Sequence, residues 1–281
     1  MELKITVYQK TNNKRIGKLL RESFSDMYSS RFLAKQLAIR DIKAQYRQSF
    51  LGIIWAFITP LSTALVWIIL SNSGTLSLTD TGVPYPVFVF SGTLLWSIVI
   101  DAINAPMLNT NGARGILSKI NFPKEALILS GVYKLISNSL IKIVLLLFFL
   151  IVYKVGLHSS ILLFPLAFLA IIFFGTTIGL FITPLGMLYN DVGKIVSLGL
   201  SFLMYATPVV YVIPKSGLLK TLMEINPLTP LLLTTRNLLF GQHIEYLAYY
   251  FGLLAACIPL FFIGLVFYRI SIPIIVERMS A

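Results

Sequence analysis

The sequence predicts an all-α protein that crosses a membrane several times. Hydrophobic residues make up 57% of its 281 residues, charged residues only 12%, and the mean hydropathy is +0.83. Several long stretches contain no Asp, Glu, Lys or Arg, and about 20 apolar residues in a helix cross the ~30 Å core of a bilayer. A soluble core helix would show a polar face every turn, and these stretches do not. They are residues 48–79, 81–100, 155–190, 195–214 and 246–268.

The N-terminal region is polar and basic, which is not the pattern of a cleavable signal peptide. Residues 1–30 are expected to form a polar basic tail, and residues 31–281 a single transmembrane domain. Within residues 31–48, apolar side chains recur at helical spacing, as at Phe32 and Ile39. This pattern predicts an amphipathic helix that lies in the membrane interface with its polar side chains at the headgroups. The side chains assigned to that contact are Arg40, Lys43, Tyr46 and Arg47.

Six spans are predicted, together with two short helices that enter the membrane and return. The apolar stretch at residues 218–240 is interrupted by Asn-Pro and Thr-Pro pairs, and proline cannot continue a helix. Each half is too short to cross the membrane as a helix, which rises about 1.5 Å per residue. We therefore predict re-entrant helices over residues 215–240. The predicted spans are residues 51–70, 86–103, 127–153, 161–187, 195–213 and 246–268.

The distribution of basic residues predicts the orientation. With six spans, 17 of the 23 Lys and Arg residues fall on the side of the N-terminus, 4 fall on the opposite side, and Lys134 and Lys142 lie within span 3. Because positive loops stay in the cytoplasm, both termini are expected there. The re-entrant helices are then extracytoplasmic.

The distribution of charged residues and the few cysteine and histidine residues exclude several functions. The net charge of +12 sits in loops between spans, so contact with anionic lipid explains it better than nucleic-acid binding. The single cysteine, Cys257, cannot form an intrachain disulfide, and His158 and His243 lie in separate loops, so no metal site is expected.

Enzymatic activity is not expected either. Residues 112–119 (GARGILSK) carry glycine and lysine, but not at the spacing of a phosphate-binding loop, so the chain alone should not bind ATP. No paired carboxylates in a loop indicate a glycan-processing site.

Asp101 and Lys142 are charged residues in otherwise apolar helices. Asp101 and Lys142 are expected to face the bundle interior or a water-filled path, where an ion pair between them is one arrangement. Alternatively, Asp101 lies at the cytoplasmic interface and the Lys142 side chain extends toward a headgroup.

Aromatic residues concentrate in spans 1, 2 and 5. One interpretation is a belt at the membrane interface. The other is a path for sugars, whose faces stack on flat rings. The residues predicted to line such a path are Trp55, Trp96, Asp101, Lys142, Tyr205 and Tyr211.

Five motifs, in this order, resemble the permease subunits of ABC exporters for polysaccharides, a type-2 ABC permease family that includes O-antigen, capsule and teichoic-acid exporters. The resemblance covers residues 31 to 281. One position departs from it, because Asn190 stands where the family usually has a basic residue before Asp191. The motifs are RDIKAQYRQSFLGIIW at residues 40–55 followed by Pro60, FSGTLLW at 90–96, KINFPK at 119–124, TPVVY at 207–211 and NPLTP at 226–230.

The resemblance implies a homodimer of permeases with two copies of a separate ATPase subunit, which binds the ATP and Mg. It implies that residues 105–125 form a cytoplasmic coupling segment docking on that ATPase, and that residues 215–240 form an outer gate. The coupling residues are Arg114, Lys119, Phe122, Pro123, Lys124 and Glu125. The gate residues are Glu224, Asn226, Pro227, Pro230 and Arg236.

The implied function is export of a lipid-linked polysaccharide, such as an O-antigen, capsule or teichoic-acid polymer, across the bacterial inner membrane. An ABC permease of the same fold that moves a drug or a simple lipid is the alternative. A membrane enzyme of glycan assembly would need a carboxylate-rich loop, which the sequence lacks.

Overall fold

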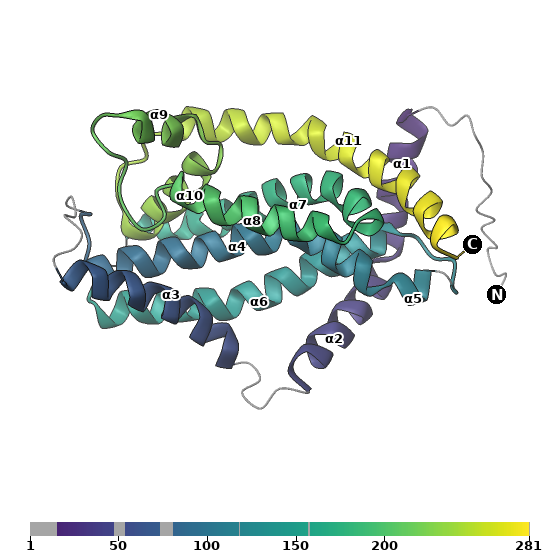
Figure 1. Ribbon diagram of the computed structural model, residues 1–281, viewed down its shortest axis with the longest axis horizontal. Helices are drawn as coiled ribbons and strands as arrows, with labels where there is room; N and C mark the ends of the chain where they lie inside the picture. The colour runs from purple at the N-terminus through teal and green to yellow at the C-terminus, as the bar shows by residue number, and fades with distance from the viewer. Residues whose placement is uncertain (1–15, 48–53, 74–80, 118, 157, 281) are drawn as a thin grey trace.

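The computed structural model describes residues 16–47, 54–73, 81–117, 119–156 and 158–280. Every regular element in these ranges is helical, which confirms the predicted all-α class. The long helices lie alongside one another, parallel to the longest axis of the molecule (Figure 1). The α1 helix, α5 and the end of α11 gather at one end of the bundle, and α9 and α10 lie at the other (Figure 1).

Within the described ranges, four helical segments are long and apolar enough to cross a membrane: Tyr85–Gly112, Glu125–Val152, Ser159–Leu188 and Leu247–Arg278. A shorter apolar helix covers Phe57–Asn72. The chain is therefore a polytopic membrane protein. Its elements are α1 (Ile16–Ser29), α2 (Arg31–Arg47), α3 (Trp55–Asn72), α4 (Tyr85–Gly112), α5 (Arg114–Leu117), α6 (Glu125–Val152), η2 (Ser159–Leu163), α7 (Phe164–Leu188), α8 (Asp191–Tyr205), α9 (Leu218–Ile225), α10 (Leu228–Phe240) and α11 (Leu247–Ser280).

The N-terminal region contains two helices, where the sequence predicted a tail and one helix. The α1 helix lies within residues 1–30 and contacts α11, where the rings of Phe24 and Phe262 are 5.6 Å apart. The second helix, α2, occupies the residues where the sequence predicted a helix, and its place at the membrane interface stays a prediction. It contacts α6 through a face that includes the buried Ala34 and Ala38, while Phe32 is 71% exposed.

The α4 helix is the centre of the bundle because α7 approaches it very closely. A Cβ atom added to Gly175 would lie 2.4 Å from the Cβ of Ala102, and one added to Gly179 would lie 2.4 Å from the carbonyl oxygen of Ile103. Residues four apart share one face of a helix. These two glycines thus form a small-residue face of the kind that lets transmembrane helices approach each other.

Two helices continue beyond the predicted ends of their spans. The α4 helix runs to Gly112 rather than to residue 103, so the first part of the predicted coupling segment is helical. Its Pro106 is buried in the helix, and the carbonyl oxygen of Pro106 accepts a 2.7 Å hydrogen bond from the Thr110 hydroxyl. The α11 helix runs to Ser280 rather than to residue 268. In both cases the predicted span ends where charged or polar residues begin, but the helix continues through these residues beyond its apolar part.

The α8 helix ends at Tyr205, although span 5 was predicted to reach residue 213. Pro208 explains the difference, because proline lacks an N–H group and disfavours helix at the preceding residue. The carbonyl oxygens freed by this break need other donors in an apolar environment.

Side chains from the segment beyond α9 supply those donors. The amide nitrogen of Asn226 donates to the carbonyl oxygen of Ala206 at 2.9 Å. The Nη1 atom of Arg236 donates to the carbonyl oxygens of Pro208 and Val209 at 3.0 and 3.2 Å. Asn226 and Arg236 therefore join the two short helices α9 and α10 to the broken end of α8.

The contact between α4 and α7 predicts the effect of a substitution at Gly179. The Gly179→Ala variant should lose about 1–3 kcal/mol of stability, because the added methyl group meets a backbone oxygen that cannot move aside. Thermal unfolding in detergent, followed by size-exclusion chromatography, measures the loss. Gly252→Ala is the matched control, since a Cβ there meets nothing within 4 Å. Equal melting temperatures for the two variants would contradict the close contact.

Candidate functional site

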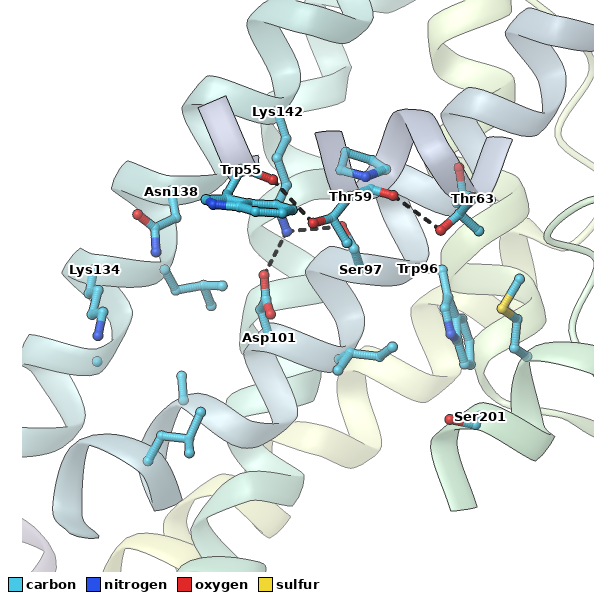
Figure 2. Close-up of a pocket in the computed structure, with 18 of the residues that line it drawn as sticks. Trp55, Thr59, Thr63, Trp96, Ser97, Asp101, Lys134, Asn138, Lys142 and Ser201 are labelled. Atoms are coloured by element: carbon cyan, nitrogen blue, oxygen red, sulfur yellow. Dashed lines mark hydrogen bonds and ion pairs between the residues drawn. The ribbon is translucent and has the colours of Figure 1, made fainter. Parts of the chain in front are cut away.

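A cavity of about 750 Å³ lies between α3, α4, α6 and α8, with Gln45 of α2 at its edge. Its walls combine aromatic rings with charged and hydroxyl side chains (Figure 2). Five of the six residues predicted to line a path meet there, although they come from four separate helices. They are Trp55, Trp96, Asp101, Lys142 and Tyr205.

The ion pair that the sequence suggested is present in this cavity. The Nζ atom of Lys142 lies 2.7 Å from Oδ2 of Asp101 and donates to Oγ of Ser97 at 2.9 Å. The Lys142 side chain is 12% exposed and that of Asp101 is 46% exposed. The part-buried ammonium group of Lys142 therefore holds a carboxylate that faces the cavity and can accept hydrogen bonds there.

The aromatic side chains differ in how they meet the cavity. Trp55 and Tyr205 are 53% and 55% exposed, so their rings are accessible. Trp96 is 3% exposed, and its Nε1 atom has no hydrogen-bond partner among the residues that the structure describes. Tyr211 does not line the cavity but donates its hydroxyl to the carbonyl oxygen of Tyr205. Its contact with the cavity wall is thus indirect.

Sequence reasoning missed several polar residues of the cavity. Lys134 and Asn138 precede Lys142 at intervals of four, so all three share one face of α6. That spacing was visible in the sequence, but nothing in the sequence showed that this face meets a cavity. In Figure 2, Asn138 and Lys134 lie to one side of the ion pair, and Trp96 and Ser201 lie to the other. The other polar lining residues that were missed are Gln45, Thr59, Thr63, Thr93, Ser97, Asn109 and Ser201.

A second cavity of about 800 Å³ lies between α4, α7 and α8 and shares Asp101 and Ser201 with the first. Asn104, Asn111 and Lys194 line it, together with Asn190. Asn190 thus contributes a neutral amide to this wall, at the position where the sequence departs from the family pattern.

The predicted coupling residues lie around α5 and the start of α6. The Nη2 atom of Arg114 donates to the carbonyl oxygen of Met187 at 2.7 Å, which ties α5 to the end of α7. Phe122 is buried, while Lys119 is exposed. Pro123 is half-buried, just ahead of α6. This segment is therefore anchored by Arg114 and Phe122 and presents Lys119 to its surroundings.

An ion-pair cluster that the sequence did not reveal joins this segment to the N-terminal helix. Arg269 of α11 pairs with the buried Glu125 at the start of α6, and its Nη2 atom lies 2.8 Å from Asp26 and 3.5 Å from Glu22 of α1. Beside it, burial lowers the pKa of Lys124, and the neighbouring Glu125 carboxylate opposes that shift. Arg269 thus connects three helices at one end of the bundle.

The remaining predicted residues occupy two surfaces. On α2, Arg40 pairs with Asp41 at 2.7 Å, and Lys43 and Arg47 are exposed; the side chain of Tyr46 lies outside the described set.

At the opposite end, Arg236 is 2% exposed and stacks over the Phe88 ring at 3.9 Å. Pro227 is the N-cap residue of α10 and Pro230 is buried within that helix, while Glu224 forms a partly exposed pair with Lys220 at 3.7 Å. Of the residues predicted for the gate, Asn226, Pro230 and Arg236 are therefore the buried ones. Within the described ranges, no three His, Cys, Asp or Glu side chains gather as a metal site requires.

Long apolar helices around a cavity with polar walls define the class of polytopic helical membrane proteins. Residues 33–240 match the family described as ABC-2 type transporter. Because this match covers well over half of the 281 residues, the chain belongs to that family. It is therefore a transport subunit in the membrane.

Three characterised proteins are similar to the chain over most of their length. One is the O-antigen export system permease protein RfbA of Myxococcus xanthus, 28% identical over 221 residues, which cover 78% of this chain and 84% of that protein. Two proteins of the same name come from Klebsiella pneumoniae. One is 24% identical over 83% of this chain and 91% of its own length. The other is 25% identical over 74% of this chain and 80% of its own length.

The Asp101–Lys142 pair predicts an asymmetry between two lysine substitutions. Lys142→Leu should lower the free energy of unfolding by about 1–3 kcal/mol, because it leaves a carboxylate without its counter-ion beside apolar helices. This loss lies between the values typical of exposed and of buried ion pairs. The control is Lys194→Leu, whose pair with Asp191 has side chains 83% and 80% exposed. It should cost less than about 0.5 kcal/mol. Melting temperatures of the two purified variants measure the difference, and equal values would contradict a supporting role for the buried ammonium.

Proposed function

We propose that the chain is the membrane-spanning subunit of an ABC exporter that moves a lipid-linked polysaccharide out of the cytoplasm. The observation that carries this proposal is the cavity, whose walls join accessible aromatic rings to a carboxylate held by Lys142. The names of the three similar permeases support a substrate of the O-antigen kind.

The cavity suits a sugar chain on chemical grounds. Unmet polar groups cost several kcal/mol each in an apolar environment, and a polysaccharide carries many hydroxyls. The carboxylate of Asp101, 46% exposed, can accept a hydrogen bond from a hydroxyl, while the rings of Trp55 and Tyr205 can stack on sugar faces. Such contacts lower the cost of passage without holding one sugar tightly, as a moving polymer requires.

The proposed topology has six spans, formed by α3, α4, α6, α7, α8 and α11, with α9 and α10 as re-entrant helices. These six helices run lengthwise side by side, and α9 and α10 share one end of the bundle (Figure 1). The charge distribution of 17 to 4 supports a cytoplasmic location for both termini. We place the chain in the bacterial inner membrane, with α2 in its cytoplasmic interface. Asn226 and Arg236 join the outer gate, formed by α9 and α10, to α8.

The proposed complex contains two copies of the chain and two ATPase subunits, which bind ATP and Mg. Exposed apolar side chains on α8, including Ile195, Leu198 and Phe202, support contact with a second copy. On the cytoplasmic side, Lys119 and α5 are accessible for the ATPase, and the Glu125–Arg269 pair transmits their movement to α6 and α11. Residues 105–125 are thus the proposed coupling segment.

Substitutions in the cavity test the proposed path. Trp55→Leu and Tyr205→Leu should each lower surface polysaccharide about three- to tenfold, because each removes a stacking ring worth about 0.5–1.5 kcal/mol beyond its area. The assay complements a strain that lacks the gene, with the partner ATPase present, and measures surface polymer and the amount of permease in the membrane.

Phe251→Leu is the matched control, since Phe251 is 60% exposed on α11 and lies outside the cavity. Normal export by the variants of Trp55 and Tyr205, at normal protein levels, would contradict the path. Export of a drug or simple lipid instead of polymer by the unaltered complex would contradict the substrate.

A further inference from the structure

Lys134 is a charge that the proposed path leaves unexplained. Among the residues that the structure describes, three charged side chains line the main cavity, and two of them, Asp101 and Lys142, neutralise each other. Lys134 is half-buried in α6 and has no ion pair within the described part of the chain. The cavity therefore carries one uncompensated positive charge beside apolar helices. A charge in such a place is costly, so it indicates an anionic ligand.

The position of Lys134 on α6 points to a membrane-resident ligand. At about 100° per residue, Lys134 lies about 40° from Asn138 on the cavity side and about 40° from Phe148 on the other side. Phe148 belongs to an exposed apolar face that also contains Leu140, Val144 and Ile151. Lys134 thus stands at the boundary between the cavity wall and a surface suited to lipid chains.

We propose that Lys134 binds the phosphoryl group of an amphiphile whose chain lies on the exposed apolar face of α6 and whose polar part enters the cavity. This inference rests on the proposed function and deepens it, because it places the junction between lipid and sugar at one side chain. The Asn138 side chain, one turn along the same face, is positioned to contact the same group. Sugars beyond the phosphoryl group then reach Trp55 and Asp101.

Tryptophan fluorescence tests the site, because Trp55 and Trp96 line the cavity and the third tryptophan, Trp67, does not. The full chain with Trp67→Phe is placed in nanodiscs of phosphatidylcholine and titrated with hexadecyl phosphate. Hexadecyl phosphate should change the emission with saturation. Lys134→Gln should weaken binding about tenfold, the effect of losing one charged hydrogen-bond partner. Lys134→Arg should bind within about threefold of the unaltered chain.

Matched probes separate the sources of the phosphoryl group. Hexadecanol tests the alkyl chain without the anion, inorganic phosphate tests the anion without the alkyl chain, and phosphatidylglycerol tests bulk anionic lipid. Each should bind at least tenfold more weakly than hexadecyl phosphate. The control variant is Lys154→Gln, whose exposed lysine lies at the other end of α6 and should bind normally.

Several results would overturn the site. One is that the Lys134→Gln variant binds hexadecyl phosphate as tightly as the unaltered chain does, with the same melting temperature and elution volume. Another is that any one of the three comparison probes binds the unaltered chain as tightly as hexadecyl phosphate does. Because binding is measured on the purified chain, such a failure would leave the export assay intact. Failure of export with intact phosphate binding would instead reject the proposed function.

Discussion

The rest of the structure depends on the close approach of α7 to α4. Gly175 and Gly179 bring the two backbones together, so that α4 is buried along most of its length. A central helix held in this way fixes the direction of every side chain it carries. One face presents Ser97 and Asp101 to the cavity. Further along, Thr110 contacts the Tyr268 hydroxyl at 2.9 Å, next to the ion pairs of Arg269. The cavity and the α1 end of the bundle are therefore placed by one helix contact.

A second constraint is that polar groups among apolar helices need partners within the protein. Three cations satisfy this requirement in different ways. Arg236 donates to the backbone where α8 breaks, and Lys142 donates to Asp101 and Ser97. Arg269 joins carboxylates of α1 and α6. Each cation connects segments that are far apart in the sequence, so the few charges of this chain organise its apolar helices.

The sequence predicted the helical class, the multiple spans and the positions of most helices, because long uncharged stretches report burial in lipid directly. The interruption at residues 226–230 also predicted the short helices α9 and α10. The sequence did not predict the end of α8 at Tyr205 or the helix in residues 1–30. It did not assign Lys134 or Arg269 either, because their surroundings come from other helices. The six-span topology, the dimer and the ATPase contacts remain predictions.

Chemical blocking of the cavity is the most direct test of the claim that it is the path of the polymer. Ser201 is exposed and lines both cavities, so a cysteine there can carry a bulky maleimide inside them. In a Cys257→Ser background, modification of Ser201→Cys should stop export, while modification of Ile258→Cys, 51% exposed on α11, should not. Unchanged export after complete modification of Ser201→Cys would contradict the path.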